Sequence, residues 1–179
     1  MPAKLAVLGL LVEQPLHGYG VERLIEQRGM RKWTSVGFSS IYQILDQLVD
    51  EGLASVEIVP APGRGKQRRL HSPTAAGRRL WVLETTAALA TVADTDEGFL
   101  TAFSCLPLLD PGVALEALER RLANLDAGIA ALDHDRSQVG PVPDFIDAMF
   151  GYTRTRLLAA RAWLVEFLST LSTPKETQP

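Results

Sequence analysis

One stretch of the sequence, residues 39–71, constrains the fold more than any other. It begins with SSIYQILDQLVDEGL, in which four apolar residues recur at helical spacing: Ile41, Ile44, Leu45 and Leu48. Ser40 followed by Gln43 is the capping-box pattern of a helix start, and Gly52 is typical of a helix end. The next segments, ASVEIV and KQRRLH, flank the turn PAPGRG and predict a β-hairpin with a long loop.

Helical segments surround this stretch on both sides. The segments 3–14, 18–29 and 73–93 all have the composition and boundary residues of helices. Three short helices, a two-stranded hairpin and a further helix follow one another in the order of a winged helix-turn-helix. We therefore predict a mostly α fold with a small β-hairpin. Residues 1–90 are expected to form a winged helix-turn-helix domain, and residues 91–179 a helical C-terminal domain.

The chain is acidic, with 21 Asp and Glu against 18 Lys and Arg, yet its positive charge is concentrated. Residues 60–83 hold six arginines and lysines and no carboxylate, whereas residues 86–179 carry 13 acidic and 7 basic side chains. Affinity for DNA follows the counterions released at the contact, so a locally basic surface is sufficient. The hairpin is therefore predicted to be a wing that contacts DNA through Arg64, Lys66, Arg68 and Arg69.

The polar face of the helix that follows residue 39 is the candidate for base contacts. A helix-turn-helix places the N-terminal part of its recognition helix in the major groove, where polar side chains reach base edges. We assign this role to Ser39, Ser40, Tyr42, Gln43 and Gln47. His17 and Tyr19, in the turn before the second helix, are weaker candidates, because residues at such positions more often serve the structure.

Three pieces of the sequence resemble the PadR family of transcriptional regulators: LAVLGLLVEQPLHGYGVERLIE, SSIYQILDQLVDEGLASVE and RLHSPTAAGRRL, in that order. The resemblance implies that the recognition-helix contacts of the family correspond here to Ser39, Ser40, Tyr42 and Gln43. It implies further that His17-Gly18-Tyr19 starts the second helix and that the wing contains Arg64, Lys66 and Arg68. The sequence departs from the family at Asp46, where a basic residue is common, and at Leu70 and His71, where wing aromatics are common.

The second half of the chain carries a heptad pattern. Six apolar residues repeat at alternating spacings of three and four: Leu115, Leu118, Leu122, Leu125, Ile129 and Leu132. A last helix is expected over about residues 143–171. PadR proteins of the longer type resemble this arrangement, with a helical C-terminal domain through which two chains pair, so we expect a homodimer with coiled-coil packing. The same stripe could instead be buried within one chain's own bundle, and both alternatives stay open.

Several other classes of protein are not expected. No phosphate-binding loop, serine elbow or pair of catalytic carboxylates stands out, so we expect no enzyme, no cofactor and no metal site. Cys105 is the one cysteine, which excludes an internal disulfide, suits a reducing cytoplasm and predicts a buried thiol. No stretch approaches the ~20 apolar residues of a membrane span.

Together these features predict a cytoplasmic, dimeric repressor that binds an inverted-repeat operator in double-stranded DNA. By the resemblance, a signal releases it, and we expect a small apolar or aromatic effector near Phe99, Trp163 and Phe167. The alternative is a protein–protein interaction module that kept the winged-helix shape and lost DNA binding. Asp46 and Asp50, two acids on the candidate recognition helix, support that alternative.

Overall fold

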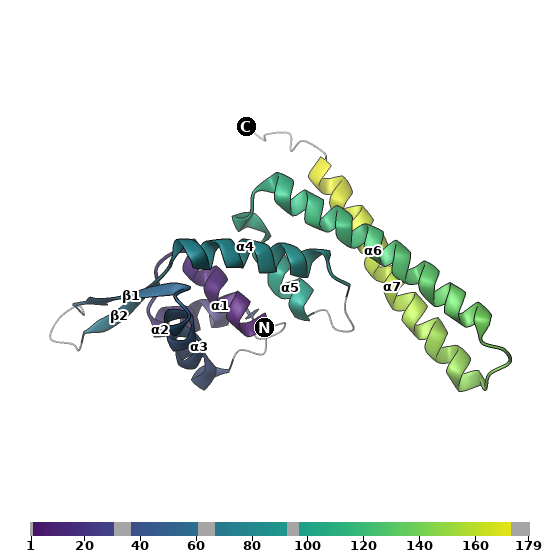
Figure 1. Cartoon of the computed structure of the whole chain (residues 1–179), viewed down its shortest axis with the longest axis horizontal. Helices are drawn as coiled ribbons and strands as arrows, with labels where there is room; N and C mark the ends of the chain where they lie inside the picture. Colours follow the sequence, from purple (N-terminus) through teal and green to yellow (C-terminus); the bar gives the residue numbers. More distant parts are fainter. Residues whose placement is uncertain (1, 31–36, 61–66, 93–96, 173–179) are drawn as a thin grey trace. The chain divides into compact units, whose positions relative to one another are not determined.

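The computed structural model describes residues 2–30, 37–60, 67–92 and 97–172, and the chain divides into two compact units. The first unit comprises residues 1–89 and 93–111, and the second comprises residues 90–92 and 112–179. The predicted fold class is confirmed: three helices, a two-stranded hairpin and a further helix follow one another, and long helices end the chain (Figure 1). The predicted separation of functions at residue 90 stays a prediction.

The helix α1 (Pro2–Glu13) is the central helix of the first unit. It contacts α2 (Gly18–Gln27), α3 (Phe38–Asp50), α5 (Glu97–Ser104) and the second strand of the hairpin. Residues 5–11 are buried on every side of the helix, which explains why this segment has no polar face. The two neighbouring helices bury their apolar stripes in the same core: Val21, Ile25, Ile41, Leu45 and Leu48.

The helix α3 begins earlier than its sequence predicts. Gly37 is the N-cap, and the Ser40 hydroxyl donates a hydrogen bond of 2.6 Å to the Gly37 carbonyl oxygen. The predicted capping box at Ser40 and Gln43 is therefore wrong, because the serine lies inside the first turn and its hydroxyl acts as a donor. The predicted end of the helix is confirmed: Gly52 has a φ of +69°, a left-handed conformation that favours glycine.

The hairpin pairs β1 (Ala54–Val59) with β2 (Arg68–Pro73) in antiparallel register, with His71 opposite Val56 (Figure 1). On its other edge, the backbone of His71 exchanges hydrogen bonds of 2.8 and 3.0 Å with the backbone of Leu16. Leu16 precedes α2, so β2 is held both by β1 and by the turn before α2. The base of the hairpin is therefore fixed relative to the start of α2.

Thr74 joins the hairpin to the next helix, α4 (Ala75–Ala90). Its Oγ1 accepts the backbone N–H of Gly77 at 3.0 Å and donates to the Gly52 carbonyl oxygen at 2.8 Å. The first turn of α4 and the turn after α3 lie so close together that a Cβ at residue 77 would be 2.0 Å from the Leu53 carbonyl oxygen. One hydroxyl thus caps α4 and ties it to the turn after α3.

The second unit is dominated by α6 (Pro111–Gln138) and α7 (Asp144–Ser172), which run antiparallel (Figure 1). A 3-10 helix, Leu106–Leu108, comes before α6 in the chain and belongs to the first unit. Ion pairs between described side chains connect the two long helices: Asp126–Arg161, Asp133–Arg154 and Arg136–Asp147. Because exposed pairs contribute little free energy, we attribute the stability of this helix pair to its buried leucines: Leu118, Leu125 and Leu164.

Candidate nucleic-acid interface

Three segments that the sequence predicts to contact DNA line one hollow of the first unit, with a volume of about 410 Å³. We call it the wing hollow. It is lined by the start of α2, the exposed face of α3 and the beginning of β2, and its lining includes His17, Tyr19, Tyr42, Asp46, Arg68, Arg69 and His71. The fold thus brings residues that are distant in the sequence into a single surface.

The start of α2 is built around His17. Its Nδ1 accepts the backbone N–H of Gly20 at 2.9 Å and so caps the helix. Its Nε2 lies 3.3 Å from Nη1 of Arg68 on the wing strand. Gly18 permits a close approach to α3, because a Cβ at this position would lie 2.4 Å from Cε1 of Tyr42. His17 therefore has a structural role at the junction of α2 and the wing, and its contact with DNA stays a prediction.

The exposed face of α3 carries most of the predicted base-contact residues. Tyr42, Gln43 and Gln47 are exposed, and Tyr19 at the start of α2 is exposed as well. The Gln47 side chain donates a hydrogen bond of 2.8 Å to the Glu51 carboxylate. Ser40 is half-buried, and the side chain of Ser39 lies outside the described residues. Base contact by these side chains stays a prediction.

The strand β2 contributes two exposed arginines. Arg68 approaches His17 as described above, and Nη1 of Arg69 lies 2.8 Å from Oδ1 of Asp46 on α3. The other two predicted wing residues, Arg64 and Lys66, lie outside the described residues. Arg68 therefore approaches the start of α2, and Arg69 approaches α3.

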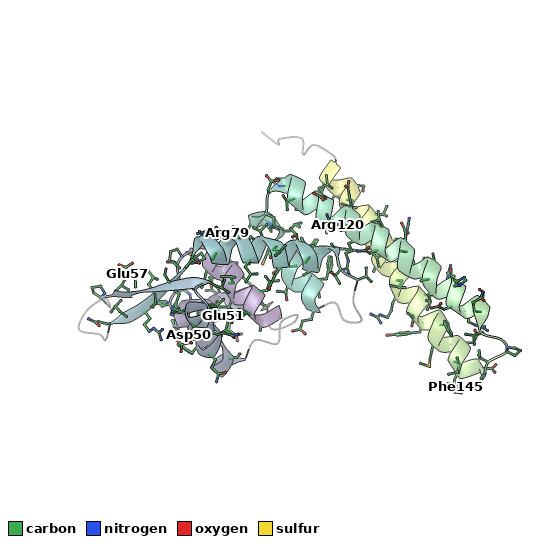
Figure 2. All side chains as sticks on the ribbon, viewed as in Figure 1. Asp50, Glu51, Glu57, Arg79, Arg120 and Phe145 are labelled. Atoms are coloured by element: carbon green, nitrogen blue, oxygen red, sulfur yellow. The ribbon has the colours of Figure 1, made fainter. Side chains whose placement is uncertain are left out.

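The acids of α3 are the feature of the sequence that argued most against DNA binding. Of the two acids that the sequence brought into question, Asp46 is paired with Arg69 and Asp50 is exposed, whereas Glu51, the C-cap residue after the helix, is paired with Lys4 of α1. The hydrogen bond from Lys4 is the main cause that holds the pKa of the Glu51 carboxyl below its usual range. Figure 2 labels Glu51 and its neighbour Asp50 at the end of α3. Asp46, which departs from the PadR pattern, is thus opposed by a wing cation.

His71 lines the wing hollow and was not among the predicted site residues. Its side chain is 4% exposed, and neither ring nitrogen has a hydrogen-bond partner among the described residues. Burial lowers the pKa of the imidazole and the charge of Arg69 lowers it further, so the neutral ring is favoured. In a strand, residues two apart lie on the same face, so the alternating pattern gives His71 the same environment as the exposed Arg69. The sequence pattern therefore could not predict that His71 is buried.

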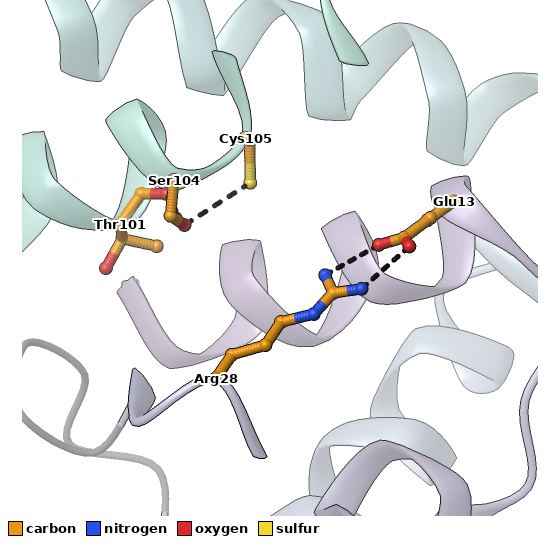
Figure 3. A network of polar contacts seen from close by, with 5 residues as sticks. All are labelled: Glu13, Arg28, Thr101, Ser104 and Cys105. Atoms are coloured by element: carbon orange, nitrogen blue, oxygen red, sulfur yellow. Dashed lines mark hydrogen bonds and ion pairs between the residues drawn. The ribbon is translucent and has the colours of Figure 1, made fainter. Parts of the chain in front are cut away.

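A second hollow, of about 270 Å³, is lined by α1, the residues that follow α2 and the residues around Cys105. Arg28 donates two hydrogen bonds of 2.7 Å to the carboxylate of Glu13, one to each oxygen (Figure 3). Cys105 is buried, as the sequence predicts, and burial raises the pKa of its thiol. Ser104 Oγ lies 3.9 Å from the sulfur (Figure 3). The thiol is therefore held in its protonated, unreactive form.

The six residues of the heptad stripe are not equivalent in the single chain. Leu118 and Leu125 are buried, Leu115 is exposed, and the remaining three are half-buried: Leu122, Ile129 and Leu132. On the same helix, an ideal Cβ at Gly128 would lie 3.9 Å from Cδ1 of Leu157 on α7. Part of the stripe is thus used within the chain, and its role in dimerisation stays a prediction.

The three candidate effector-pocket residues are distributed over the two units. The ring of Phe99, in the first unit, lies 5.5 Å from the ring of Phe103. Trp163 and Phe167, on α7 of the second unit, stack with their ring centroids 5.6 Å apart. An effector pocket that joins Phe99 to the other two stays a prediction.

Among the described residues, no group of three or more His, Cys, Asp or Glu side chains could hold a metal ion. In the same part of the chain, none of the helices combines the length and the apolarity that a membrane crossing requires. The wing hollow offers cations, hydrogen-bonding side chains and exposed tyrosine rings, the groups that commonly contact phosphates and base edges.

Residues 7–81 match the family described as "Transcriptional regulator PadR-like family", a family of regulators and not of enzymes. No curated protein matches the chain by sequence. Among solved structures, it is similar to Bacillus subtilis PadR in complex with operator DNA, with 22% identity and a TM-score of 0.43 over 94% of this chain and 98% of that chain. For Bacillus subtilis PadR in complex with p-coumaric acid, the identity is 20% and the TM-score 0.42, over 97% and 100% of the two chains. The PadR-like regulator BC1756 from Bacillus cereus is 22% identical with a TM-score of 0.40, over 96% and 97%. The matched segment contains the whole wing hollow.

Proposed function

We propose, because residues 7–81 match the PadR-like family of transcriptional regulators, that the chain is a dimeric repressor that binds double-stranded operator DNA and is released by a small effector. One observation carries the DNA-binding part of this proposal. The start of α2, the exposed face of α3 and two arginines of β2 line a single hollow. A surface of this composition suits the backbone and groove edges of a duplex.

We assign sequence choice to α3 and backbone attraction to the wing. Exposed glutamines such as Gln43 and Gln47 suit bidentate hydrogen bonding to adenine in the major groove. Arg68 and the predicted wing residues Arg64 and Lys66 suit phosphates, each contact releasing condensed counterions. The overall negative charge of the chain does not oppose this division, because residues 86–179 carry 13 of the 21 acids.

Dimerisation is supported by large apolar side chains that α7 exposes to solvent. Phe145, Met149, Tyr152 and Trp163 are exposed in the single chain, and Figure 2 labels the first of them near the start of α7. Their spacing places them on one face of the helix. Extended apolar patches of this kind mark interaction surfaces. We propose that a second copy covers this face, together with part of the α6 stripe around Leu115.

Sedimentation would test the dimer. Met149→Glu places a charge in the middle of the exposed face and is expected to yield monomers, whereas Ala162→Glu, on a different exposed face of α7, is expected to leave the dimer intact. A two-fold dimer would bind an inverted repeat with half-sites about 34–36 Å apart, one helical turn of DNA. A Met149→Glu protein that remains dimeric contradicts the assignment of this face.

The proposed effector is a small apolar or aromatic molecule. A similar structure, that of Bacillus subtilis PadR, was solved in complex with p-coumaric acid, which is an aromatic acid. In this chain the candidate residues are Phe99, Trp163 and Phe167, and an effector must bind the DNA-free state better than the DNA-bound state. Titration of aromatic acids against the DNA complex, in wild type and Trp163→Phe, tests the proposal. Equal release from both proteins would show that Trp163 takes no part.

The experiment that tests the function as a whole is retardation of duplex DNA taken from upstream of the protein's own gene, with competitor DNA present. We expect a retarded complex whose affinity falls steeply with salt. The exposed α7 face and Asp50 favour a second candidate, a protein–protein interaction module without DNA binding. Absence of retardation, combined with dimerisation or partner capture through α7, would support that candidate instead.

A further inference from the structure

An ion pair connects the two elements that we propose to contact DNA. Oδ1 of Asp46 on α3 and Nη1 of Arg69 on β2 are 2.8 Å apart, with side-chain exposures of 54% and 50%. Both residues line the wing hollow. An ion pair this exposed is weak, because water and salt screen it, so a competing phosphate could displace the carboxylate. The ion pair can therefore open when a phosphate approaches Arg69.

Asp46 occupies a position from which it can reach a base edge. It follows Gln43 by three residues and Tyr42 by four, and all three side chains are exposed on α3. Residues at these spacings lie on the same face of a helix. If this face enters the major groove, as we propose above, the carboxylate of Asp46 enters with it.

The arginine is anchored at its backbone and free to move at its tip. Arg69 lies opposite Ile58 in the hairpin ladder, and two residues further along β2 the backbone of His71 is hydrogen-bonded to Leu16. The origin of the Arg69 side chain is thus fixed relative to α2 and β1. Its half-exposed guanidinium can turn from the carboxylate to a nearby phosphate without a change in the backbone.

A carboxylate in the major groove distinguishes between bases. It accepts a hydrogen bond from the N4 amino group of cytosine, but guanine presents it with the acceptors O6 and N7, and the carboxylate is repelled by the phosphates. A free Asp46 is therefore tolerated at a cytosine and disfavoured at a guanine. While it stays paired with Arg69, the arginine is withheld from the DNA backbone.

Resting on the proposed DNA-binding function, we propose that Asp46 is a specificity-determining residue that acts by exchange of partners. On the operator, Asp46 turns to a cytosine amino group and Arg69 turns to a phosphate. On other sequences no donor receives the carboxylate, so the ion pair stays closed and one phosphate contact is lost. Asp46 thereby couples base reading by α3 to backbone contact by the wing, and it lowers the affinity for non-operator DNA.

The test compares Asp46→Asn with Asp50→Asn, a matched control that removes the same charge from an exposed acid four residues further along α3. Affinities are measured by fluorescence anisotropy for the best duplex selected by the wild type and for a random duplex, over a range of salt. We expect Asp46→Asn to bind the random duplex more tightly than Asp50→Asn does. The ratio of operator to random affinity should fall on the order of tenfold in Asp46→Asn, as expected for one base contact. The salt slope on random DNA should steepen by about 0.9 through the released arginine.

A second variant identifies the released cation. Introducing Arg69→Gln into Asp46→Asn should return the salt slope on random DNA to the wild-type value. Sites selected with Asp46→Asn should lose a cytosine preference at one position in each half-site. If Asp46→Asn behaves like Asp50→Asn, or weakens binding to all duplexes alike, the exchange is refuted while DNA binding stands. If the folded wild-type protein binds no duplex at all, both the proposed function and the exchange are refuted.

Discussion

The hydroxyl of Thr74 is expected to contribute measurably to the stability of the first unit. It accepts the Gly77 N–H as the cap of α4 and donates to the Gly52 carbonyl oxygen, at 3.0 and 2.8 Å. Loss of a cap costs about 1 kcal/mol, and loss of the second hydrogen bond costs about 0.5–1.5 kcal/mol. Thr74→Val removes both hydrogen bonds at nearly constant shape. Its free energy of unfolding should therefore fall by about 2 kcal/mol.

Thr74→Ser is the matched control, because it keeps the hydroxyl and should lose far less stability. Urea unfolding can be followed by the emission of Trp81, which is buried in α4, in a background where the other two tryptophans are phenylalanine. With a slope of about 2 kcal/mol per molar urea, the midpoint of the valine variant should fall by about 1 M. Equal midpoints for the valine and serine variants would refute the reasoning, since they would show that the hydroxyl contributes nothing.

Three further predictions follow from buried side chains. Burial lowers the pKa of His71, so the unfolded chain binds a proton at this residue more readily than the folded chain does. The free energy of unfolding should therefore be highest above about pH 6.5 and fall as the pH drops below that value. His71→Leu should flatten this dependence in urea titrations from pH 8 to 5, and an unchanged profile would assign it to other groups. Leu118→Ala should lower the free energy of unfolding by about 2–5 kcal/mol, and Leu115→Ala should lower it by about 0.5 kcal/mol. Both are measured in the Met149→Glu background, which we expect to be monomeric. Equal losses there would contradict burial of Leu118 within the chain. Cys105 should react with iodoacetamide far more slowly in native protein than in urea, and equal rates would show an accessible thiolate.

Local sequence patterns were sufficient to predict most of the helices and the hairpin. The apolar spacing of residues 41–48 predicted α3, and the alternating segments around residues 60–66 predicted the hairpin, because in both cases the pattern reflects one buried face of one element. The start of α3 was placed wrongly. Ser40 and Gln43 have the residue types of a capping box, but the helix begins at Phe38, and the hydroxyl of Ser40 donates to Gly37 instead.

The electrostatics of the candidate site depended on tertiary contacts that no local pattern contains. Asp46 and Arg69 were each identified in the sequence, one as a departure from the PadR pattern and the other as a wing cation. Their pairing requires β2 to lie beside α3, which only the folded hairpin achieves. His71 was missed for the same reason, because Leu16, which pairs with it in the folded chain, lies far away in the sequence.

The heptad stripe shows the limit of periodicity as a guide to assembly. A stripe of leucines is buried equally well by a neighbouring helix of the same chain and by a second copy. In the single chain Leu118 and Leu125 are already buried, whereas the exposed apolar residues of α7, such as Met149 and Tyr152, attracted less attention in the sequence. A pattern of spacing identifies a face to be covered, but it does not identify what covers it.

The central claim, that α3 enters the major groove in each half of a dimeric complex, can be tested by site-directed DNA cleavage. Cys105 is buried, so an iron chelate can be attached selectively to an exposed thiol in Asp50→Cys, at the end of α3, which leaves the proposed base-contact residues unchanged. The account predicts strand cleavage at two positions about 34–36 Å apart on the selected operator, and no defined cleavage on a random duplex. Defined binding of the labelled protein to the operator without cleavage at these positions would contradict the claim.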